Sequence, residues 1–370
     1  MKKKRVLVVG AFANESESKI KGGVRRVCSI LQTSQYFEVF DVKTLDSTQK
    51  SYPAPPIIVR FFYSIIRIFQ LIGTISRFKP NMVLLFCSNG LSFYEKSLMV
   101  IVAKCLGSKS VLFPRGSGRF LKQSWLNSFN GMLLRQADLV LCQGEAVKKF
   151  FQSSYGVLGS KLAVLENWTA TEEILEVGRK REYLKEDVLK ILFVGWLEPA
   201  KGTKNIIDVV KHLHKSSLNY EFNIVGDGSE KEELIKNLEV QVLQGNVIFH
   251  SWIDQNKLIN IYSNCHIFFL PSWREGLPNS LIEAMAAGLA PVTTPVGNIP
   301  SVIESNINGF LCPVNDSKSM IKKITLLLKN SNLLHKISIT AKNSAKKRFS
   351  TKENINKLIA VTDKVISGYD

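Results

Sequence analysis

The chain has 370 residues, of which 45% are hydrophobic, and it carries 49 Lys and Arg against 31 Asp and Glu, a formal net charge of +18. This length suits two domains better than one, and the hydrophobic content is enough to bury a core in each. Six dispersed cysteines without a Cys-x-x-Cys pair argue against a zinc site or a disulfide framework, so we expect reduced thiols.

The positive charge is concentrated in the first half. Residues 1–172 contain 24 Lys and Arg against 10 Asp and Glu, a net charge of +14, whereas the remainder carries only +4. An anionic membrane surface suits this half, because clustered Lys and Arg gain roughly 1 kcal/mol each near acidic lipid headgroups. The alternative is a basic surface that is merely solvated. No recognition helix, zinc finger or RNA-binding sheet motif accompanies the charge, so no nucleic acid partner is expected.

Membrane insertion is not expected from the sequence. No run of about 18 apolar residues is free of charge, so no membrane-spanning helix is predicted. The Lys-Lys-Lys-Arg start leads into a short strand and not into the long apolar segment of a signal peptide. We therefore expect a cytoplasmic protein, either free or attached peripherally to the inner face of the plasma membrane.

The first half alternates apolar strands with helical segments. Residues 5–10 form a continuous apolar run of the kind found inside parallel sheets. After a polar loop, Gly22 and Gly23 open a helix, which puts a glycine turn at its N-terminus. Such alternation predicts right-handed crossovers and a doubly wound α/β sheet. The further strands are expected at residues 82–88, 110–114 and 139–142, and the helices near residues 93–106, 120–136 and 145–155.

Residues 57–78 are rich in Ile and Phe but contain Arg60, Arg67 and Arg77. Arg60 and Arg67 are seven positions apart and share a face if the segment is a helix. Two interpretations stay open. The segment is either a core helix with one solvated basic stripe or an interfacial helix that lies on a bilayer.

The loop at residues 114–119, Pro-Arg-Gly-Ser-Gly-Arg, follows a strand and combines flexible backbone with two guanidinium groups. Arg115 and Gly116 are therefore predicted to bind a phosphate or an acceptor. No histidine base is expected here, because all five histidines lie in the second half: His212, His214, His250, His266 and His335.

A polar and mostly charged stretch, residues 171–187, is predicted to link the two halves. The strand pattern resumes at residues 189–195 and is followed by Lys201, Gly202 and a helix from about residue 203. A lysine beside a glycine just ahead of a helix is well placed to meet a diphosphate. Further strands are expected at residues 223–226, 247–252, 266–271 and 290–294.

The most informative stretch is residues 272–288, Ser-Trp-Arg-Glu-Gly-Leu-Pro-Asn-Ser-Leu-Ile-Glu-Ala-Met-Ala-Ala-Gly, which predicts a loop and then a helix after a buried strand. Helix N-termini at the carboxyl ends of parallel strands favour anionic ligands. Glu275 in the loop and Glu283 in the helix can face one cleft. For Glu283 there is also a purely structural alternative, since Ser280 and Glu283 have the spacing of a capping box.

The Glu-Gly-Leu-Pro at residues 275–278, the second glutamate eight positions on and the following Ala-Met-Ala-Ala-Gly resemble the signature of the retaining GT-B glycosyltransferases of family GT4. The resemblance implies an α/β fold of two Rossmann-like doubly wound domains that face each other across a cleft. It suggests an acceptor domain at residues 1–170, a linker at 171–187, a nucleotide-sugar domain at 188–348 and a final helix at 349–370 that packs back on the first domain.

The resemblance also implies roles for single residues. Glu275 would bind the sugar hydroxyls, Glu283 the ribose hydroxyls and Lys201 the diphosphate, with Arg115 as a further cation of the catalytic site. The remaining donor-binding residues would be Gly195, Gly202, Trp252, Ile253, Gly276, Leu277, Pro278, Asn279 and Ser280, and the phosphate or acceptor loop would contain Gly22, Gly23 and Gly116.

The chain departs from the family at Trp196, where the family has an arginine that contacts phosphate. Lys204, Arg274 and Arg115 are the candidates to replace it. No Asp-x-Asp motif is present, so neither a metal nor any cofactor beyond the nucleotide sugar is expected. The implied function is retaining transfer of a hexose from a nucleotide-diphosphate sugar to a saccharide or lipid-linked saccharide in bacterial cell-surface polysaccharide synthesis. The alternative is an inactive GT-B partner protein that binds lipid or another glycosyltransferase.

Overall fold

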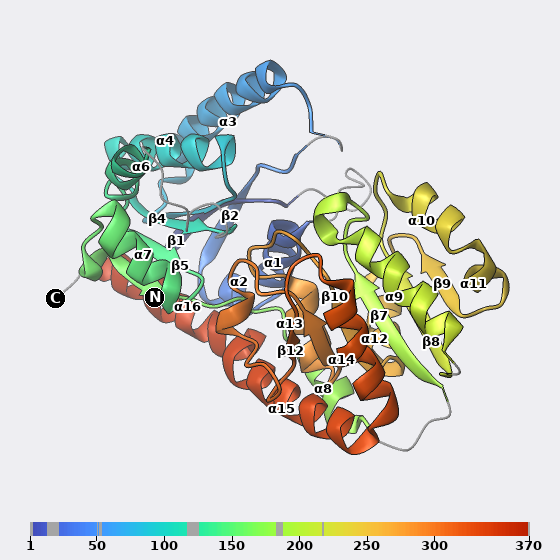
Figure 1. Ribbon diagram of the computed structural model, residues 1–370. Coiled ribbons are helices and arrows are strands. Elements are labelled where there is room, and N and C mark those ends of the chain that lie inside the picture. Colours follow the sequence, from blue (N-terminus) through green and yellow to red (C-terminus); the bar gives the residue numbers. More distant parts are fainter. Residues whose placement is uncertain are drawn as a thin grey trace. The chain divides into compact units, whose positions relative to one another are not determined.

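The computed structural model describes residues 3–12, 22–49, 51, 54–116, 126–182, 188–216 and 218–368. The chain forms two compact units, one made of residues 1–169 and 351–370 and the other of residues 170–350. Each unit contains a six-stranded parallel sheet flanked by helices (Figure 1). This arrangement confirms the predicted α/β class.

The sheet of the first unit has the strand order β2-β1-β3-β4-β5-β6. Its second strand was not predicted, because Asp-Val-Lys-Thr-Leu-Asp at the sheet edge is polar and largely exposed. The strands are β1 (Arg5–Gly10), β2 (Asp41–Asp46), β3 (Met82–Cys87), β4 (Lys109–Pro114), β5 (Leu139–Cys142) and β6 (Leu162–Val164). The helices are α1 (Gly23–Gln32), α2 (Tyr36–Val39), α3 (Ile57–Phe78), α4 (Leu91–Cys105), α6 (Asn127–Leu134), α7 (Glu145–Tyr155), the short η1 (Gly159–Lys161) and α16 (Thr351–Ser367).

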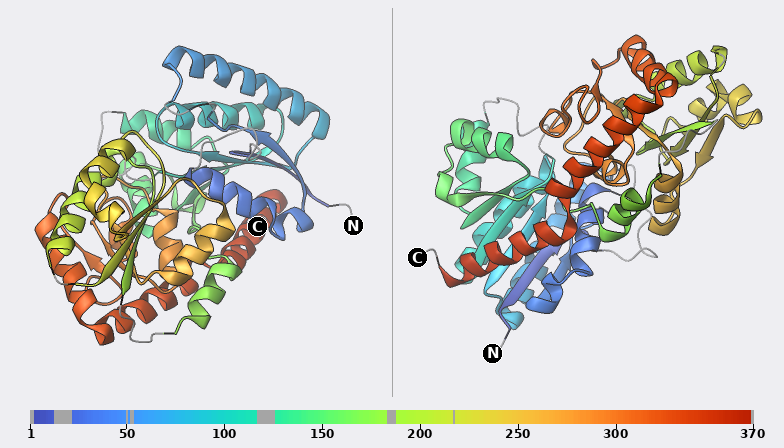
Figure 2. Two further views of the ribbon diagram at one scale, coloured as in Figure 1. Left: turned by 90° about the vertical axis from the view of Figure 1, so that its right-hand side faces the viewer. Right: turned by 90° about the horizontal axis from the view of Figure 1, so that it is seen from below.

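Successive side chains of each strand point to opposite faces of this sheet, so the buried strands contribute to two cores, one on each face. In β1, Leu7 and Val9 join the core under α3, α4, α6 and α7, whereas Val6 and Val8 join the core under α1, α2 and α16. The C-terminal helix α16 thus packs on the first sheet (Figure 2). Tyr36 of α2 and Thr362 of α16 share a hydrogen bond of 2.9 Å inside that contact.

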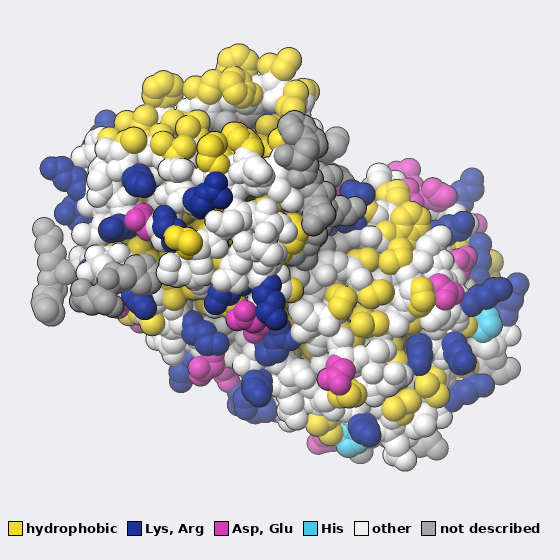
Figure 3. Space-filling view, turned by 60° about the vertical axis from the view of Figure 1, so that its left-hand side comes forward, with side chains coloured by type: hydrophobic (Ala, Val, Ile, Leu, Met, Phe, Trp, Pro, Cys, Tyr) yellow, Lys and Arg dark blue, Asp and Glu magenta, His cyan; other side chains and the backbone are white. Residues whose placement is uncertain are grey.

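Helix α3 does not behave as an ordinary core helix. Only its last third is buried, through Leu71, Ile75 and Phe78. The preceding turns expose large apolar side chains, including Phe62 at 61% and Phe69 at 69%. Figure 3 shows the resulting hydrophobic surface along the upper edge of the view. The interpretation as a core helix is therefore wrong for residues 57–69.

The prediction that the chain contains no segment able to span a membrane is wrong for helix α3. By length and composition alone this helix is apolar enough to cross one. Arg60 and Arg67 interrupt the apolar run in sequence, but both arginines face a pocket of the first unit and leave the opposite side of the helix apolar.

The sheet of the second unit has the strand order β12-β11-β10-β7-β8-β9. The strands are β7 (Leu189–Val194), β8 (Tyr220–Val225), β9 (Val247–His250), β10 (Ile267–Leu270), β11 (Ala290–Thr293) and β12 (Phe310–Leu311). The helices are α8 (Glu172–Lys180), η2 (Pro199–Lys201), α9 (Thr203–Lys215), α10 (Lys231–Asn237), α11 (Glu239–Leu243), α12 (Gln255–Asn264), α13 (Asn279–Ala286), η3 (Ile299–Ser301), α14 (Ser317–Lys329) and α15 (Ser331–Phe349).

The predicted linker at residues 171–187 needs correction. Its first part is helix α8, whose Ile174 and Leu175 are buried in the core of the second unit. Charged residues on the opposite face made this amphipathic helix look like a linker in sequence, with Arg179 bonded to Glu176 at 2.5 Å. Residues 183–187 lie outside the described residues.

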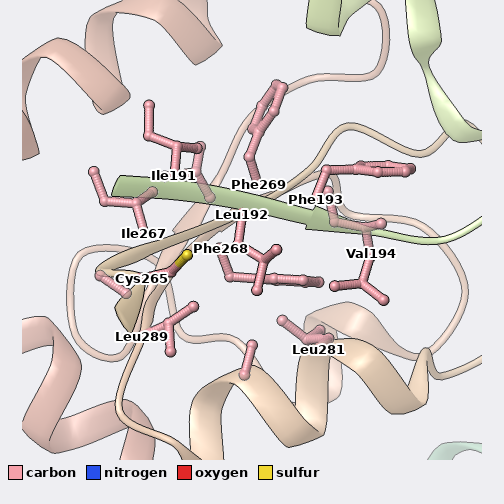
Figure 4. Packing of buried hydrophobic residues seen from close by; sticks show 14 of the residues in the cluster. Ile191, Leu192, Phe193, Val194, Cys265, Ile267, Phe268, Phe269, Leu281 and Leu289 are labelled. Atoms are coloured by element: carbon pink, nitrogen blue, oxygen red, sulfur yellow. The ribbon is translucent and has the colours of Figure 1, made fainter. Parts of the chain in front are cut away.

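The centre of the second core lies between β7, β10 and α13. In Figure 4, Ile191 and Phe193 point to one side of β7, and Val194 points to the other side, where Leu281 of α13 lies. Leu281 is fully buried. This packing places the first turn of α13 beside the carboxyl ends of the two central strands.

Candidate functional site

The predicted donor residues gather at the carboxyl edge of the second sheet, around the ends of β7 and β10. Strand β7 pairs with β8 on one side and with β10 on the other, so the strand order reverses at the junction of β7 and β10. In open parallel sheets ligands bind at such a switch point, outside the carboxyl ends of the strands.

Lys201 and Glu275 meet at this point. The Lys201 Nζ lies 2.6 Å from Glu275 Oε1, and the hydroxyl of Ser272 donates to the same oxygen at 2.7 Å. The Glu275 side chain is 8% exposed and that of Lys201 is 22% exposed. The carboxylate is thus fixed by two donors, while the ammonium keeps two of its three N–H groups for other acceptors.

Backbone contacts hold the two loops of this pair together. The amide of Trp273 donates to the carbonyl of Ala200 at 2.9 Å. Gly202 has a φ of 74°, and a Cβ at this residue would lie 2.2 Å from the carbonyl oxygen of Pro271. Only glycine permits both that conformation and that approach. Gly202 is therefore required for the geometry of Lys201.

A second loop supports Glu275 from the other side. Gly297 has a φ of 59°, and a Cβ there would lie 2.3 Å from the carbonyl oxygen of Glu275. The amide of Asn298 donates to the carbonyl of Gly276 at 2.7 Å. The loop after β11 thus fixes the backbone that carries Glu275.

The first turn of α13 lies next to β7. The hydroxyl of Ser280 donates to the carbonyl of Val194 at 3.1 Å, and α13 has no hydrogen bond from a capping side chain. The capping-box interpretation of Ser280 and Glu283 is therefore wrong, because the Ser280 hydroxyl bonds to the neighbouring strand instead. Leu277 is buried, Pro278 precedes the helix and Asn279 is its first residue.

Glu283 is buried, with 4% of its surface exposed. The hydroxyl of Tyr262 donates to Glu283 Oε2 at 3.2 Å. Tyr262 lies on α12 and was not predicted, because no motif surrounds it in sequence. The tyrosine orients the carboxylate that the resemblance associates with the ribose.

Two tryptophans stand at the ends of β7 and β9. Trp196 and Trp252 pack edge to face with ring centroids 5.1 Å apart. The Trp252 indole N–H is buried and has no hydrogen-bond partner among the described residues. The amide of Gly195, just after β7, donates to the carbonyl of Val225 at the end of β8 at 3.0 Å. Ile253 packs against the core of the second unit.

The candidate replacements for the family arginine fall in different places. Lys204 and Arg274 are both exposed in the second unit. Arg115 lies in the first unit and is buried, with its guanidinium 5.0 Å from the ring of Phe113 and 5.5 Å from that of Trp168. Burial lowers the pKa of Arg115 to about 10. Its assignment to phosphate or acceptor stays a prediction, as does that of the adjacent Gly116; residues 117–119 of the loop lie outside the described residues.

The first unit contains a pocket of about 300 Å³ at the carboxyl ends of its strands. Gly22 and Gly23 line it, as do Arg60 and Arg67 of α3. The Arg67 guanidinium forms a bidentate ion pair with Glu95 of α4, at 2.6 and 3.2 Å. Sequence reasoning paired the two arginines on one face but missed Glu95.

Within the described residues, no group of three or more His, Cys, Asp and Glu side chains is arranged to hold a metal ion. The six cysteines are free thiols; five are buried and Cys105 is exposed. Burial raises the pKa of Cys28 to about 12, so this thiol is protonated at neutral pH. The described residues of the candidate site contribute carboxylates, a lysine ammonium, hydroxyls and backbone groups.

Sequence comparison identifies related proteins. A model of the glycosyl transferases group 1 family matches residues 176–344, nearly all of the second unit. An uncharacterised glycosyltransferase of Methanocaldococcus jannaschii is 26% identical over 325 residues, which cover 86% of this chain and 82% of that protein. The UDP-Gal:α-D-GlcNAc-diphosphoundecaprenol α-1,3-galactosyltransferase of Escherichia coli is 25% identical over 54% of this chain and 53% of its own length.

Comparison of structures gives the same result for the fold. The crystal structure of Anabaena HepE in complex with UDP superposes with a TM-score of 0.68 at 16% identity, and covers 97% of this chain and 99% of that one. The same protein has been solved in complex with UDP-glucose. The second unit thus matches the glycosyl transferases group 1 family, and the chain has the GT-B fold of these solved glycosyltransferases.

Proposed function

We propose that this protein is a retaining, metal-independent glycosyltransferase of family GT4, which moves a hexose from a nucleotide-diphosphate sugar to a saccharide or lipid-linked saccharide. The observation that carries this proposal is the contact of 2.6 Å between Lys201 and Glu275 at the switch point of the second sheet. A cation and a carboxylate held together there suit a ligand with a diphosphate on one side and sugar hydroxyls on the other.

In the proposed complex, the diphosphate binds beside Lys201 and the first turn of α13. The lysine retains two N–H donors beyond its bond to Glu275, and helix N-termini favour phosphate. Gly276 lies in the loop and Gly202 follows the lysine, so the backbone comes close to the ligand at both places. Glu275, fixed by Ser272, accepts hydrogen bonds from the sugar hydroxyls.

Glu283 is proposed to accept from the ribose hydroxyls. The Tyr262 hydroxyl donates to one of its oxygens at 3.2 Å and so orients the carboxylate toward the diol. The nucleobase is assigned to the end of β9, beside Trp252 and Ile253. The indole N–H of Trp252 would donate there to a base carbonyl.

The transfer breaks the bond between the anomeric carbon and the phosphate oxygen and forms a bond from that carbon to the acceptor hydroxyl oxygen. The hydroxyl proton passes to the leaving phosphate, and retention follows if both events occur on the same face of the sugar. Lys201 stabilises the charge on the departing diphosphate. A charge-assisted hydrogen bond contributes about 1.5–3 kcal/mol and a helix terminus up to ~2 kcal/mol, which supply several powers of ten in rate without a metal.

We infer that the acceptor is presented at a membrane, with the enzyme peripheral to the inner face. Support comes from α3, whose exposed face carries Phe61, Phe62 and Phe69 and whose last turns are fixed in the core of the first unit. An amphipathic helix of this kind inserts its apolar face at the headgroup boundary. The net charge of +14 on residues 1–172 adds attraction to acidic lipids.

A thermal-shift screen tests the donor class. The full chain is heated with UDP, GDP, ADP, dTDP and their common sugar conjugates, in EDTA and then in magnesium. A ligand at 100 times its dissociation constant adds about 2.7 kcal/mol of stability, which is readily measured. A shift with one nucleotide and its sugar in EDTA supports the proposal, and proton NMR of the product then reports the anomeric configuration.

No shift with any nucleotide, with or without magnesium, would refute the proposal in favour of an inactive partner protein. A shift that requires magnesium would refute its metal-independent part. Inversion at the anomeric carbon would refute the retaining part and leave the donor site intact.

A further inference from the structure

Helix α3 has its polar and apolar faces arranged opposite to those of an ordinary surface helix. Arg60, Tyr63, Ser64 and Arg67, at helical spacing, line the pocket of the first unit. The apolar residues on the other side of the helix point outward: Ile58, Phe61, Phe62, Ile66 and Phe69. A charged inner face suits an anionic ligand, because charges leave water only when they are paired.

The described residues bring more positive than negative charge to that pocket. Its lining contains four cations, Arg25, Arg60, Arg67 and Lys96, and within the described residues a single carboxylate, Glu95. Lys96 is 2% exposed and lies 3.1 Å from Glu95, which also binds Arg67. One carboxylate thus holds two cations in place. Arg60 forms no ion pair with the residues that the structure describes.

Backbone groups add to this positive field. The N-terminus of α1 lines the pocket through Gly23, and that of α4 lines it through Leu91 and Ser92. The N-cap residues of the two helices, Gly22 and Gly90, are glycines without a capping side chain of their own. Two helix N-termini that converge with arginine and lysine side chains make a site for phosphate oxygens. A volume of about 300 Å³ is at the lower end of the range for ligand pockets.

We propose that this pocket binds the diphosphate of a lipid-linked saccharide acceptor, with Arg60, Arg67 and Lys96 as its cations, while the lipid chain leaves along the apolar face of α3. The inference rests on the proposed function and names the acceptor class. Glu95 positions Arg67 and Lys96 and does not contact the ligand. Diphosphate and lipid are recognised by opposite faces of one helix, so the anion is bound at membrane depth and not in free solution.

Flotation of the full chain on vesicles tests the proposal. The chain is first saturated with the nucleoside diphosphate found by the thermal-shift screen, so that the second unit no longer binds added diphosphate. Phosphatidylcholine vesicles carry either farnesyl diphosphate or phosphatidylglycerol at equal negative charge. We expect preferential binding to the farnesyl diphosphate vesicles, and competition by soluble pyrophosphate only at much higher concentration, because pyrophosphate lacks the apolar chain.

Arg77 provides the matched control, since it lies on the same helix, is exposed and is absent from the pocket lining. Arg60→Gln and Arg60→Glu should weaken binding to the farnesyl diphosphate vesicles about tenfold or more, the loss expected for one charge-assisted hydrogen bond. Arg77→Gln and Arg77→Glu should leave the preference unchanged. Circular dichroism and thermal unfolding verify that each variant is folded.

Equal binding to both kinds of vesicle, or equal losses for the Arg60 and Arg77 variants, would overturn the proposal, because the helix would then respond to surface charge alone. Pyrophosphate binding as tight as that of farnesyl diphosphate would overturn the lipid part. A chain that binds no nucleotide but keeps the Arg60-dependent preference would refute the proposed glycosyl transfer and still support the anion pocket, so the two failures are distinguishable.

Discussion

Arg67 and Glu95 form a bidentate ion pair between α3 and α4, 28 residues apart in the chain. The pair fixes the rotation of α3 about its axis, because a guanidinium that binds both carboxylate oxygens has one orientation. It turns the arginines toward the pocket and the phenylalanines away from it. The ion pair therefore determines both which side chains of α3 line the pocket and which apolar side chains are exposed.

Replacement of Glu95 by Gln should destabilise the protein at neutral pH by about 3–5 kcal/mol, since Arg67 and Lys96 would keep buried charges without a carboxylate. Burial tends to raise the pKa of Glu95, but Lys96 and then Arg67 outweigh it and lower that pKa below its ordinary value of 4.5. The stabilisation is therefore present above pH 4.5 and is lost as the pH falls through the lowered pKa. Urea unfolding across pH 3–7 measures this difference.

The exposed Glu38 of α2 is the control for that experiment. Glu38→Gln should change stability by no more than about 0.5 kcal/mol at any pH tested, as surface substitutions usually do. Equal unfolding curves for Glu95→Gln and the wild type would show that the buried cluster does not need its carboxylate.

The apolar face of α3 should decide membrane affinity. Phe62→Ser removes an aromatic side chain that is 61% exposed in the unit, so its loss cannot leave a core cavity. Burial of such a side chain in lipid contributes about 1.5–3 kcal/mol, which predicts at least tenfold weaker binding to anionic vesicles. Leu243→Ser, at an 80% exposed position of α11 in the second unit, should have no effect. Similar losses for both variants would show that α3 is not the contact.

Tyr262→Phe should weaken binding of the nucleotide by about tenfold, because a hydrogen bond to a charged group contributes about 1.5 kcal/mol or more. Tyr220→Phe is the matched change in the same unit, where the lost hydroxyl donates to the carbonyl of Val210 at 3.3 Å. It should lower stability and leave nucleotide affinity unaltered. Calorimetric titration compares the two, and an unchanged affinity for Tyr262→Phe would remove Glu283 from the binding site.

Gly202→Ala should distort the loop that carries Lys201. The new Cβ would meet the carbonyl oxygen of Pro271, and a φ of 74° costs a non-glycine residue about 1–2 kcal/mol. We expect lower stability together with weaker nucleotide binding. Gly73→Ala in α3, where nothing lies within 4 Å, should instead be neutral or gain up to about 1 kcal/mol. Thermal unfolding of both variants would contradict this account if Gly202→Ala were as stable as Gly73→Ala.

The parts of the site that follow strand ends could be predicted from the sequence. Lys201 and Glu275 are 74 residues apart, yet each follows an apolar strand, and parallel strands end at one edge of a sheet. Their contact is a consequence of this topology. The edge strand β2 was missed because its polar residues carry no hydrophobic pattern.

Other parts depend on packing that the sequence pattern does not contain. Glu95 and Lys96 look like solvated charges within α4, but both are buried, and the α3 arginine that contacts Glu95 lies 28 residues away in the chain. No sequence motif distinguishes Tyr262 from the other residues of α12. Its contact with Glu283 depends on how α12 and α13 pack. Ser280 has the spacing of a cap, but its hydroxyl donates to the carbonyl of Val194 on the neighbouring strand.

The most direct test of the proposed catalysis is the rate of nucleoside diphosphate release from the identified donor, in EDTA, for the wild type and for Lys201→Ala and Lys211→Ala. Lys211 is exposed on α9, close in sequence but outside the site. Lys201→Ala should lower turnover about 10²–10³-fold at saturating donor, as does the loss of one preorganised donor to a developing charge, whereas Lys211→Ala should match the wild type. Unchanged turnover of Lys201→Ala would contradict the assignment of Lys201 to the leaving diphosphate.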